Sequence, residues 1–215
     1  MDAAAGGILD PADDPAVDDG HRRARILLAL ANTMAVKGYQ ATTIDDMARE
    51  AHVSKTVVYA HFRGGKEECL LELYERATDR VLGIVRQARA AARAAGLPWR
   101  ARLRAVVSAY LSAMAVAPAV SWAALVEMQA AGPRARALRR QVVDRYVDVL
   151  AQVAAELGRE VPDEVRPVDR ALVLAAVGGI NELILARVEL GQAAALLEDA
   201  DAASEVLIGL LERRA

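Results

Sequence analysis

Apolar residues recur at helical spacing along most of the chain. Between His21 and Lys37 they return every three or four positions, and Gly38 follows as a helix stop signal. With Gly and Pro as breaks, the same pattern predicts nine helices. After the first, we expect two short helices capped by Thr43 and Ser54, then helices over about 66–95, 99–116, 119–131, 134–157, 168–190 and 193–213.

Composition supports an all-α protein. Hydrophobic residues make up 54% of the 215 residues but aromatic residues only 4%, and Ala, Leu and Val dominate. We expect three parts: a tail over 1–20, a first module over 21–68 and a second over 69–215. The boundary between the modules falls inside the fourth predicted helix, near Cys69.

Charge is distributed unevenly among these parts. Residues 1–20 hold six acidic residues and no basic one, which predicts a disordered acidic tail. Residues 21–66 hold eight basic and three acidic residues, whereas the remainder is nearly neutral. The first module is therefore suited to attract phosphate groups.

Several classes of protein are disfavoured. The single cysteine, Cys69, allows no intrachain disulfide and fits a reducing compartment. The apolar run near 171–180 is interrupted by Asn181 and Glu182, so we expect no membrane span. No catalytic motif or Cys/His metal set is evident, so we expect no enzyme, cofactor or metal site, and a cytoplasmic protein.

The stretch Thr43–Phe62 predicts two short helices joined by a tight turn. Its apolar positions would form a small core with the first helix: Ile44, Met47, Ala48, Val53, Val58 and Phe62. Such a pair can place its second helix in the major groove of DNA. The outward positions of that second helix would be Lys55, Thr56, Val57 and Tyr59.

These outward side chains suit a duplex. Ser54 and Thr56 can donate to phosphates or base edges, Lys55 can reach a guanine or a phosphate, and Val57 can touch a thymine methyl group. Three later side chains are better placed for the DNA backbone: Tyr59, His61 and Lys66.

The order of these residues resembles the N-terminal domain of TetR/AcrR-family transcriptional regulators over about residues 22–70. The matching positions are Gly38-Tyr39, Thr42-Thr43-Ile44, Met47-Ala48, Val53-Ser54, Val58-Tyr59, His61-Phe62 and Lys66-Glu67. The resemblance implies an all-helical homodimer that binds a palindromic operator, with a C-terminal domain that dimerises and binds a small ligand. It also implies operator contacts from Thr43, Ser54, Lys55, Thr56, Tyr59, His61 and Lys66.

The chain departs from the family pattern at two places. His52 stands where the turn usually has Gly, and a left-handed backbone is expected there. Thr56-Val57 stands where the recognition helix often has Gly-Thr, so the base contact at Val57 differs from the usual one.

Polar and aromatic residues interrupt the apolar second module and predict a ligand pocket with mostly apolar walls. The candidates are Tyr110, Met114, Trp122, Glu127, Met128, Tyr146 and Asn181. Each could instead be an ordinary core or surface residue. Residues 168–190, with Gly178-Gly179, and residues 193–213 are expected to form a four-helix dimer interface.

The leading hypothesis is a repressor that binds double-stranded operator DNA as a homodimer and is released by a small apolar or amphipathic effector. A second is a DNA-binding protein without an effector, controlled by a protein partner. A third is a helical enzyme or lipid-binding protein whose N-terminal match is accidental.

Overall fold

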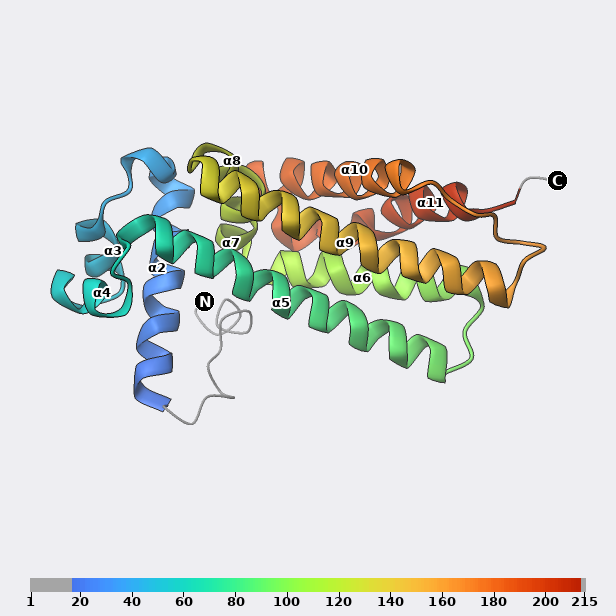
Figure 1. The fold of residues 1–215 in the computed structure, drawn as a ribbon, viewed down its shortest axis with the longest axis horizontal. Helices are drawn as coiled ribbons and strands as arrows, with labels where there is room; N and C mark the ends of the chain where they lie inside the picture. The colour runs from blue at the N-terminus through green and yellow to red at the C-terminus, as the bar shows by residue number, and fades with distance from the viewer. Residues whose placement is uncertain (1–16, 214–215) are drawn as a thin grey trace. The chain divides into compact units, whose positions relative to one another are not determined.

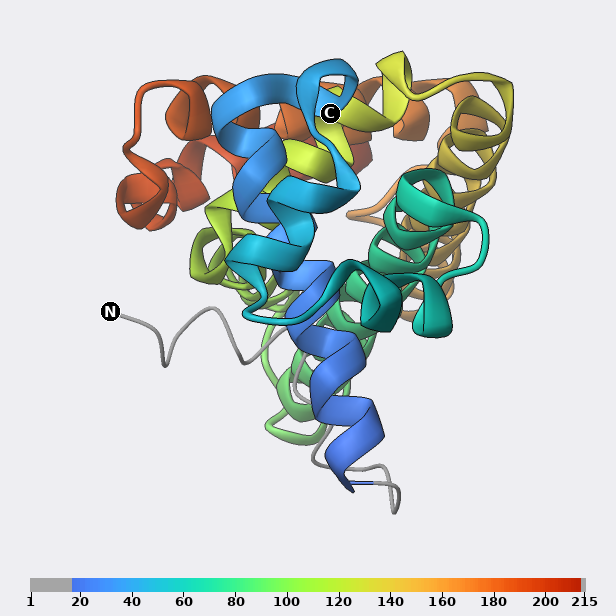
Figure 2. The same ribbon diagram turned by 90° about the vertical axis from the view of Figure 1, so that its left-hand side faces the viewer.

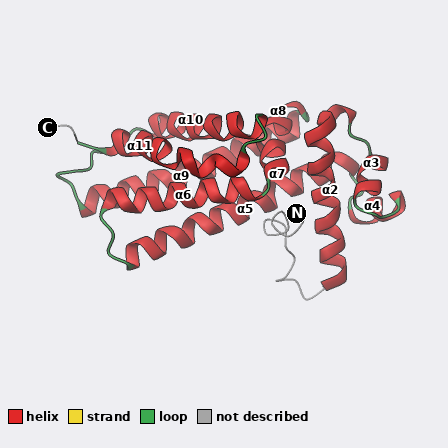
Figure 3. Cartoon of the chain, turned by 180° about the vertical axis from the view of Figure 1, so that it is seen from behind, coloured by secondary structure: helices red, strands yellow, loops and turns green. Residues whose placement is uncertain are grey.

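The computed structural model describes residues 17–213, and every regular element among them is a helix (Figures 1 and 3). The prediction of an all-α protein is confirmed. Of the predicted acidic tail, residues 1–16 lie outside the described part. The elements are α2 (Val17–Ala41), α3 (Ile44–Glu50), α4 (Lys55–His61), α5 (Gly65–Ala94), α6 (Trp99–Val116), α7 (Pro118–Trp122), η1 (Ala123–Glu127), α8 (Met128–Ala130), α9 (Pro133–Glu160), α10 (Arg170–Glu189), η2 (Ala193–Asp199) and α11 (Ala200–Leu211).

These helices form two compact units. The first contains the residues up to Arg80 together with Val116–Arg140, and the second contains Val81–Ala115 and Gln141–Ala215. The first unit therefore includes α7 and η1, which pack against α2 although they follow it at a long distance along the chain. The long helices α5 and α9 contribute residues to both units.

The short helices of the first unit begin at the predicted caps. The Thr43 side chain accepts a hydrogen bond from the Asp46 amide, and the Asp46 side chain accepts one from the Thr43 amide, which completes a capping box. The Ser54 hydroxyl accepts from the Val57 amide. Between the two helices His52 has φ of 54°, so the expected left-handed turn is confirmed.

The first helix begins earlier than predicted, whereas its break agrees with the prediction. It begins at Val17, four residues before the predicted His21, and an acidic residue such as Asp19 suits the positive end of a helix dipole. Gly38 breaks it as predicted, with φ of 75° and ψ of 163°. The chain then makes one more turn, closed by the bond from the Thr42 amide to the Gly38 carbonyl.

The second unit is a helical bundle. Helices α6, α10 and α11 lie beside the C-terminal parts of α5 and α9 in both Figure 1 and Figure 3. Part of its core is a cluster of three buried valines, Val147, Val173 and Val177, which joins α9 to α10. Apolar contact between helices is thus the main stabilising term in this unit.

Two of the predicted helices are not regular. The sequence predicts one helix over residues 119–131, but a π-helical turn, η1, separates α7 from α8. It also predicts one helix over residues 193–213, but these residues begin as the 3₁₀ helix η2. The guanidinium of Arg187 holds Asp199 at the end of η2 at 2.7 and 2.8 Å, a contact that helical periodicity does not reveal.

Helix α10 lies within the predicted helix over 168–190 and is strongly apolar. Its 20 residues meet the length and composition of a membrane span, although an apolar helix at a protein interface passes the same test. Only 28% of its most apolar window is buried within the described chain. Length and composition alone do not decide between these two cases, so the absence of a membrane span stays a prediction. The exposed apolar surface of α10 requires an explanation.

An ion pair joins α2 to α5 inside the first unit. Arg23 donates from Nε to Glu72 Oε1 at 2.6 Å and from Nη2 to Glu72 Oε2. The other amino group of Arg23 donates to the His61 carbonyl at 2.8 Å, so one guanidinium links three helices. Burial raises the pKa of Glu72, but Arg23 and Arg76 together outweigh it and hold that pKa below its ordinary value of 4.5.

Replacing Glu72 with Gln should lower the free energy of unfolding by about 1–3 kcal/mol at pH 7, since it removes a charge-assisted pair. A carboxylate whose pKa is depressed in the folded state stabilises the protein above its unfolded pKa, near 4.5, and loses that contribution as the pH falls through the folded value. The stability difference between wild type and E72Q should therefore shrink below about pH 4.5. Urea denaturation between pH 3 and 7 measures it.

Glu75→Gln is the matched control, because Glu75 is an exposed carboxylate on the same helix. A difference for E72Q that stays constant down to pH 3 would contradict this account of the pair.

Candidate nucleic-acid interface and ligand pocket

The outer face of α4 carries the side chains that the sequence predicted for base contacts. Ser54, Lys55 and Thr56 are exposed, Val57 is half-buried, and the Tyr59 side chain is 45% exposed. On the inner side of the same helix Val58 is buried, as is Phe62 directly after it. In Figure 2 α2, in blue, runs beside the shorter α3 and α4, in lighter blue and teal.

The Lys55 side chain is paired with a carboxylate. Its ammonium lies 2.9 and 3.1 Å from the two carboxylate oxygens of Asp45 on α3. Asp45 raises the pKa of Lys55, and both side chains are more than half exposed. Asp45 was not among the residues predicted to matter at this surface. Its charge, opposite to that of Lys55, was the signal in the sequence that could have identified it.

Thr43 is exposed but already occupied as a cap. Besides the capping box, its hydroxyl donates to Asp46 Oδ2 at 2.8 Å. Lys37, which lies 2.7 Å from Asp46, contributes most to lowering the pKa of Asp46 far below its ordinary value, and Thr43 follows. The carboxylate stays ionised and fixes the start of α3.

Two predicted phosphate contacts face inward. The His61 side chain is only 9% exposed, and its Nε2 lies 3.6 Å from Asp19. The Lys66 ammonium donates to the carbonyls of Tyr39 at 2.5 Å and Thr42 at 2.8 Å, and lies over the Tyr39 ring at 4.2 Å from its centroid. Burial lowers the pKa of Lys66. In this structure both side chains hold the helices together.

Three other basic residues border α4 and were not predicted as DNA contacts. Arg25, Arg49 and Arg63 are exposed, and Arg25 donates to the Ala51 carbonyl at 2.9 Å. Among residues 17–213, no group of three or more His, Cys, Asp or Glu side chains could hold a metal ion. The exposed chemistry of this surface is that of hydrogen-bond donors and cations.

Residues 26–73 match the family model described as "Bacterial regulatory proteins, tetR family". The HTH-type transcriptional activator FasR of Mycolicibacterium smegmatis is 37% identical over 89 residues, which cover 41% of this chain and 38% of the relative. The TetR-family regulator PfmR from Thermus thermophilus is 26% identical, with a TM-score of 0.69 over 89% of this chain and 98% of that one. The helix-turn-helix of this chain therefore matches the DNA-binding domain of TetR-family regulators.

A second solved structure resembles this protein in fold. It is the transcriptional regulator FadR from Bacillus subtilis in complex with stearoyl-CoA, with a TM-score of 0.70 at 18% identity, covering 86% of this chain and 96% of that one. Together, the family match and the fold indicate a DNA-binding helix-turn-helix domain over residues 26–73.

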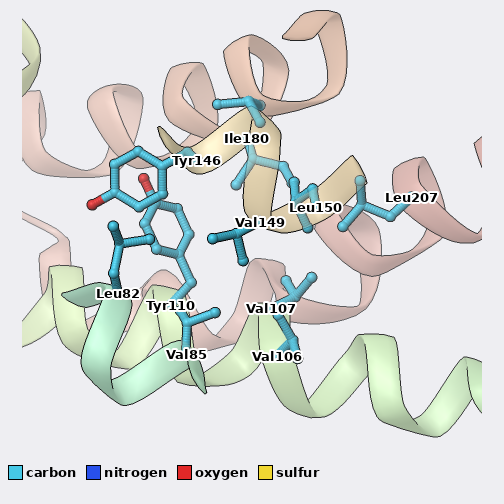
Figure 4. Close-up of a pocket in the computed structure, with 11 residues that line it drawn as sticks. Leu82, Val85, Val106, Val107, Tyr110, Tyr146, Val149, Leu150, Ile180 and Leu207 are labelled. Atoms are coloured by element: carbon cyan, nitrogen blue, oxygen red, sulfur yellow. The ribbon is translucent and has the colours of Figure 1, made fainter. Parts of the chain in front are cut away.

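The second unit of the chain contains an apolar cavity. Its space is about 470 Å³, including the part open to solvent. Nine aliphatic side chains and two tyrosines line it (Figure 4). The rings of Tyr110 and Tyr146 meet edge to face, with centroids 5.7 Å apart, and the Tyr110 hydroxyl donates to Asn181 at 2.7 Å.

The seven predicted pocket residues do not all lie together in the structure. Tyr110 and Tyr146 line the cavity, and Asn181 contacts Tyr110. Met114 is buried in α6 and is not part of the lining. The remaining three belong to the first unit, where Met128 is fully buried and Trp122 donates to Glu127 at 2.9 Å.

The lining residues that the sequence analysis missed are aliphatic. They come from five helices: Leu82, Val85, Val106, Val107, Val149, Leu150, Val177, Ile180 and Leu207. A valine that lines a cavity has the same sequence pattern as one that fills a core, so the sequence provided no signal for them.

Proposed function

We propose that this protein is a repressor that binds a palindromic operator as a homodimer in the cytoplasm and is released by a ligand with a long apolar chain. The exposed outer face of α4 in a TetR-family chain carries the proposal. Of the predicted contacts, Ser54, Lys55, Thr56, Val57 and Tyr59 would face the major groove or its phosphates. Thr43 would meet a phosphate from the start of α3.

His61 and Lys66 would act differently from their sequence-based prediction. Because their side chains have internal partners, we propose that they position the helices rather than reach the DNA. In the unbound protein, the pair with Asp45 would keep the Lys55 side chain extended. On binding DNA, Lys55 would exchange Asp45 for a base or a phosphate.

The exposed face of α10 supports the dimer. Leu172 and Leu174 are about half exposed, and a Cβ added at Gly178 or Gly179 would meet nothing within 4 Å. A glycine inside a helix costs about 1 kcal/mol relative to alanine, so two in succession without an intrachain contact need a reason. A second copy of the chain, packed closely on the glycines, would supply one and would cover the leucines.

The cavity supports the apolar ligand. Its aliphatic lining suits an alkyl chain, and the Tyr110–Asn181 pair offers a polar group for orientation. The structurally similar FadR from Bacillus subtilis is in complex with stearoyl-CoA. In this protein an acyl chain would occupy the cavity, and a charged group attached to it would stay outside the apolar lining.

Activation is a second candidate for the direction of control, because FasR, the relative over 89 residues, is described as an activator. Deleting the gene in the source organism separates the two candidates. Transcription next to the bound operator should rise after loss of a repressor and fall after loss of an activator.

Genomic fragments selected on the purified protein should contain one palindromic sequence. Lys55→Ala should weaken binding to it by about ten- to a hundredfold, the range of a lost base contact. Fluorescence anisotropy measures the affinity. Arg159→Ala, which removes an exposed charge in the second unit, should leave the affinity nearly unchanged. A folded K55A variant with wild-type affinity would refute the α4 interface.

Gly178→Leu should shift the protein toward monomers, because the new side chain would stand where the second copy approaches. Sedimentation over a range of concentrations measures the dimer dissociation constant, which should rise by tenfold or more, about 1.4 kcal/mol. Gly83→Leu is the control, since an added Cβ there also meets nothing within 4 Å but lies on α5. Equal dimer stability in both variants would exclude this face.

Stearoyl-CoA should bind the protein and weaken its hold on the operator. Val149→Trp should abolish the binding by filling the cavity, whereas Val36→Trp, at a valine that is 85% exposed, should not. Calorimetry measures the binding of stearoyl-CoA to the wild type and to each variant. Absence of binding to the wild type would reject the acyl ligand and favour control by a protein partner. Unchanged binding to V149W would move the site elsewhere.

A further inference from the structure

Glu127 is a buried carboxylate with no role in the DNA contacts or the cavity. It is 6% exposed and ends the π-helical turn η1. Its Oε2 accepts from the Tyr39 amide at 2.8 Å, and its Oε1 accepts from the Trp122 indole at 2.9 Å. The partners provided by the described residues are thus neutral N–H groups, and burying a charge is costly unless its hydrogen bonds are well formed.

The Tyr39 peptide lies at the break where α2 ends. Gly38 is left-handed there, so the Tyr39 N–H cannot continue the helical ladder. Glu127 accepts from the Tyr39 N–H, and Lys66 donates to the Tyr39 carbonyl, so the peptide groups on both sides of this residue are held. Four residues later Thr43 caps α3, the helix that contacts α4.

Glu127 is connected by the chain to the second unit. It lies in the segment Val116–Arg140, which packs with α2 and is flanked on both sides by residues of the second unit. Helix α6 precedes this segment and most of α9 follows it. A π-helical turn is a rare irregularity that often marks a functional position, and here it ends at the residue that reaches Tyr39.

We propose that Glu127 is a positioning residue that couples the ligand-binding helices to the DNA-binding helices through the Tyr39 peptide. A displacement of α6 or α9 moves η1, and η1 moves the break between α2 and α3. Since coupling between two sites is reciprocal, operator binding changes the second unit by the same route. The inference rests on the proposed operator binding, but it does not depend on the identity of the ligand.

Amide hydrogen exchange of the full-length protein, with and without the selected operator fragment, tests the proposal. In Glu127→Ala the Tyr39 amide should exchange about ten- to a hundredfold faster, because a hydrogen bond to a buried carboxyl group is lost. Operator affinity should fall by about tenfold or more. In the wild type, operator binding should change exchange within 99–115 and 141–160, and at saturating operator this change should disappear in E127A.

Two further variants separate positioning from simple destabilisation. Val120→Ala removes buried apolar atoms from α7 in the same unit, and it should lower stability while leaving the operator-induced change in the second unit intact. Glu127→Gln keeps one acceptor oxygen and should restore part of the operator affinity and of the coupling.

The outcomes are distinct. If E127A behaves like V120A at equal loss of stability, or if the wild type shows no operator-induced change in the second unit, the role of Glu127 is overturned while operator binding stands. If no genomic fragment binds the wild type, operator binding itself fails and the role of Glu127 fails with it.

Discussion

The ammonium of Lys66 satisfies the carbonyl groups left over where α2 ends. A helix end leaves acceptors that must find donors, and the break at Gly38 places two of them, on Tyr39 and Thr42, in the partly buried interior of the first unit. One cation from the start of α5 serves both. The junction between α2 and the helix-turn-helix is therefore stabilised by a cation whose partners lie inside the first unit.

Other charged side chains of the first unit also hold its helices together. Arg23 lies over the Phe62 ring, pairs with Glu72 and donates to the His61 carbonyl, so it supports the end of α4 from within. Asp46 combines a cap with an ion pair to Lys37. Part of the positive charge counted along the sequence thus holds the helices together, whereas Arg25, Arg49, Lys55 and Arg63 are exposed.

Local signals in the sequence were sufficient for the helix-turn-helix. Thr43 and Ser54 cap their helices through atoms three residues away, and His52 sits in a turn whose geometry is set by its neighbours. What could not be predicted depends on distant partners: the Lys55–Asp45 pair, the inward turn of Lys66, and the bond from Tyr39 to Glu127, 88 positions apart. The π-helical turn at 123–127 escaped for a related reason, because periodicity does not register one inserted residue.

The carboxylate of Asp45 beside Lys55 has a consequence for the ionic atmosphere of DNA. A cation that is already neutralised attracts phosphate weakly, and the nearby carboxylate is repelled by it. If Lys55 meets DNA as proposed, fewer condensed counterions would be released at this position on unrelated sequence, so its share of background binding would be weaker and less dependent on salt. A base that accepts the Lys55 ammonium would restore the lost contact, and the discrimination between right and wrong sequence would grow without any increase in total positive charge.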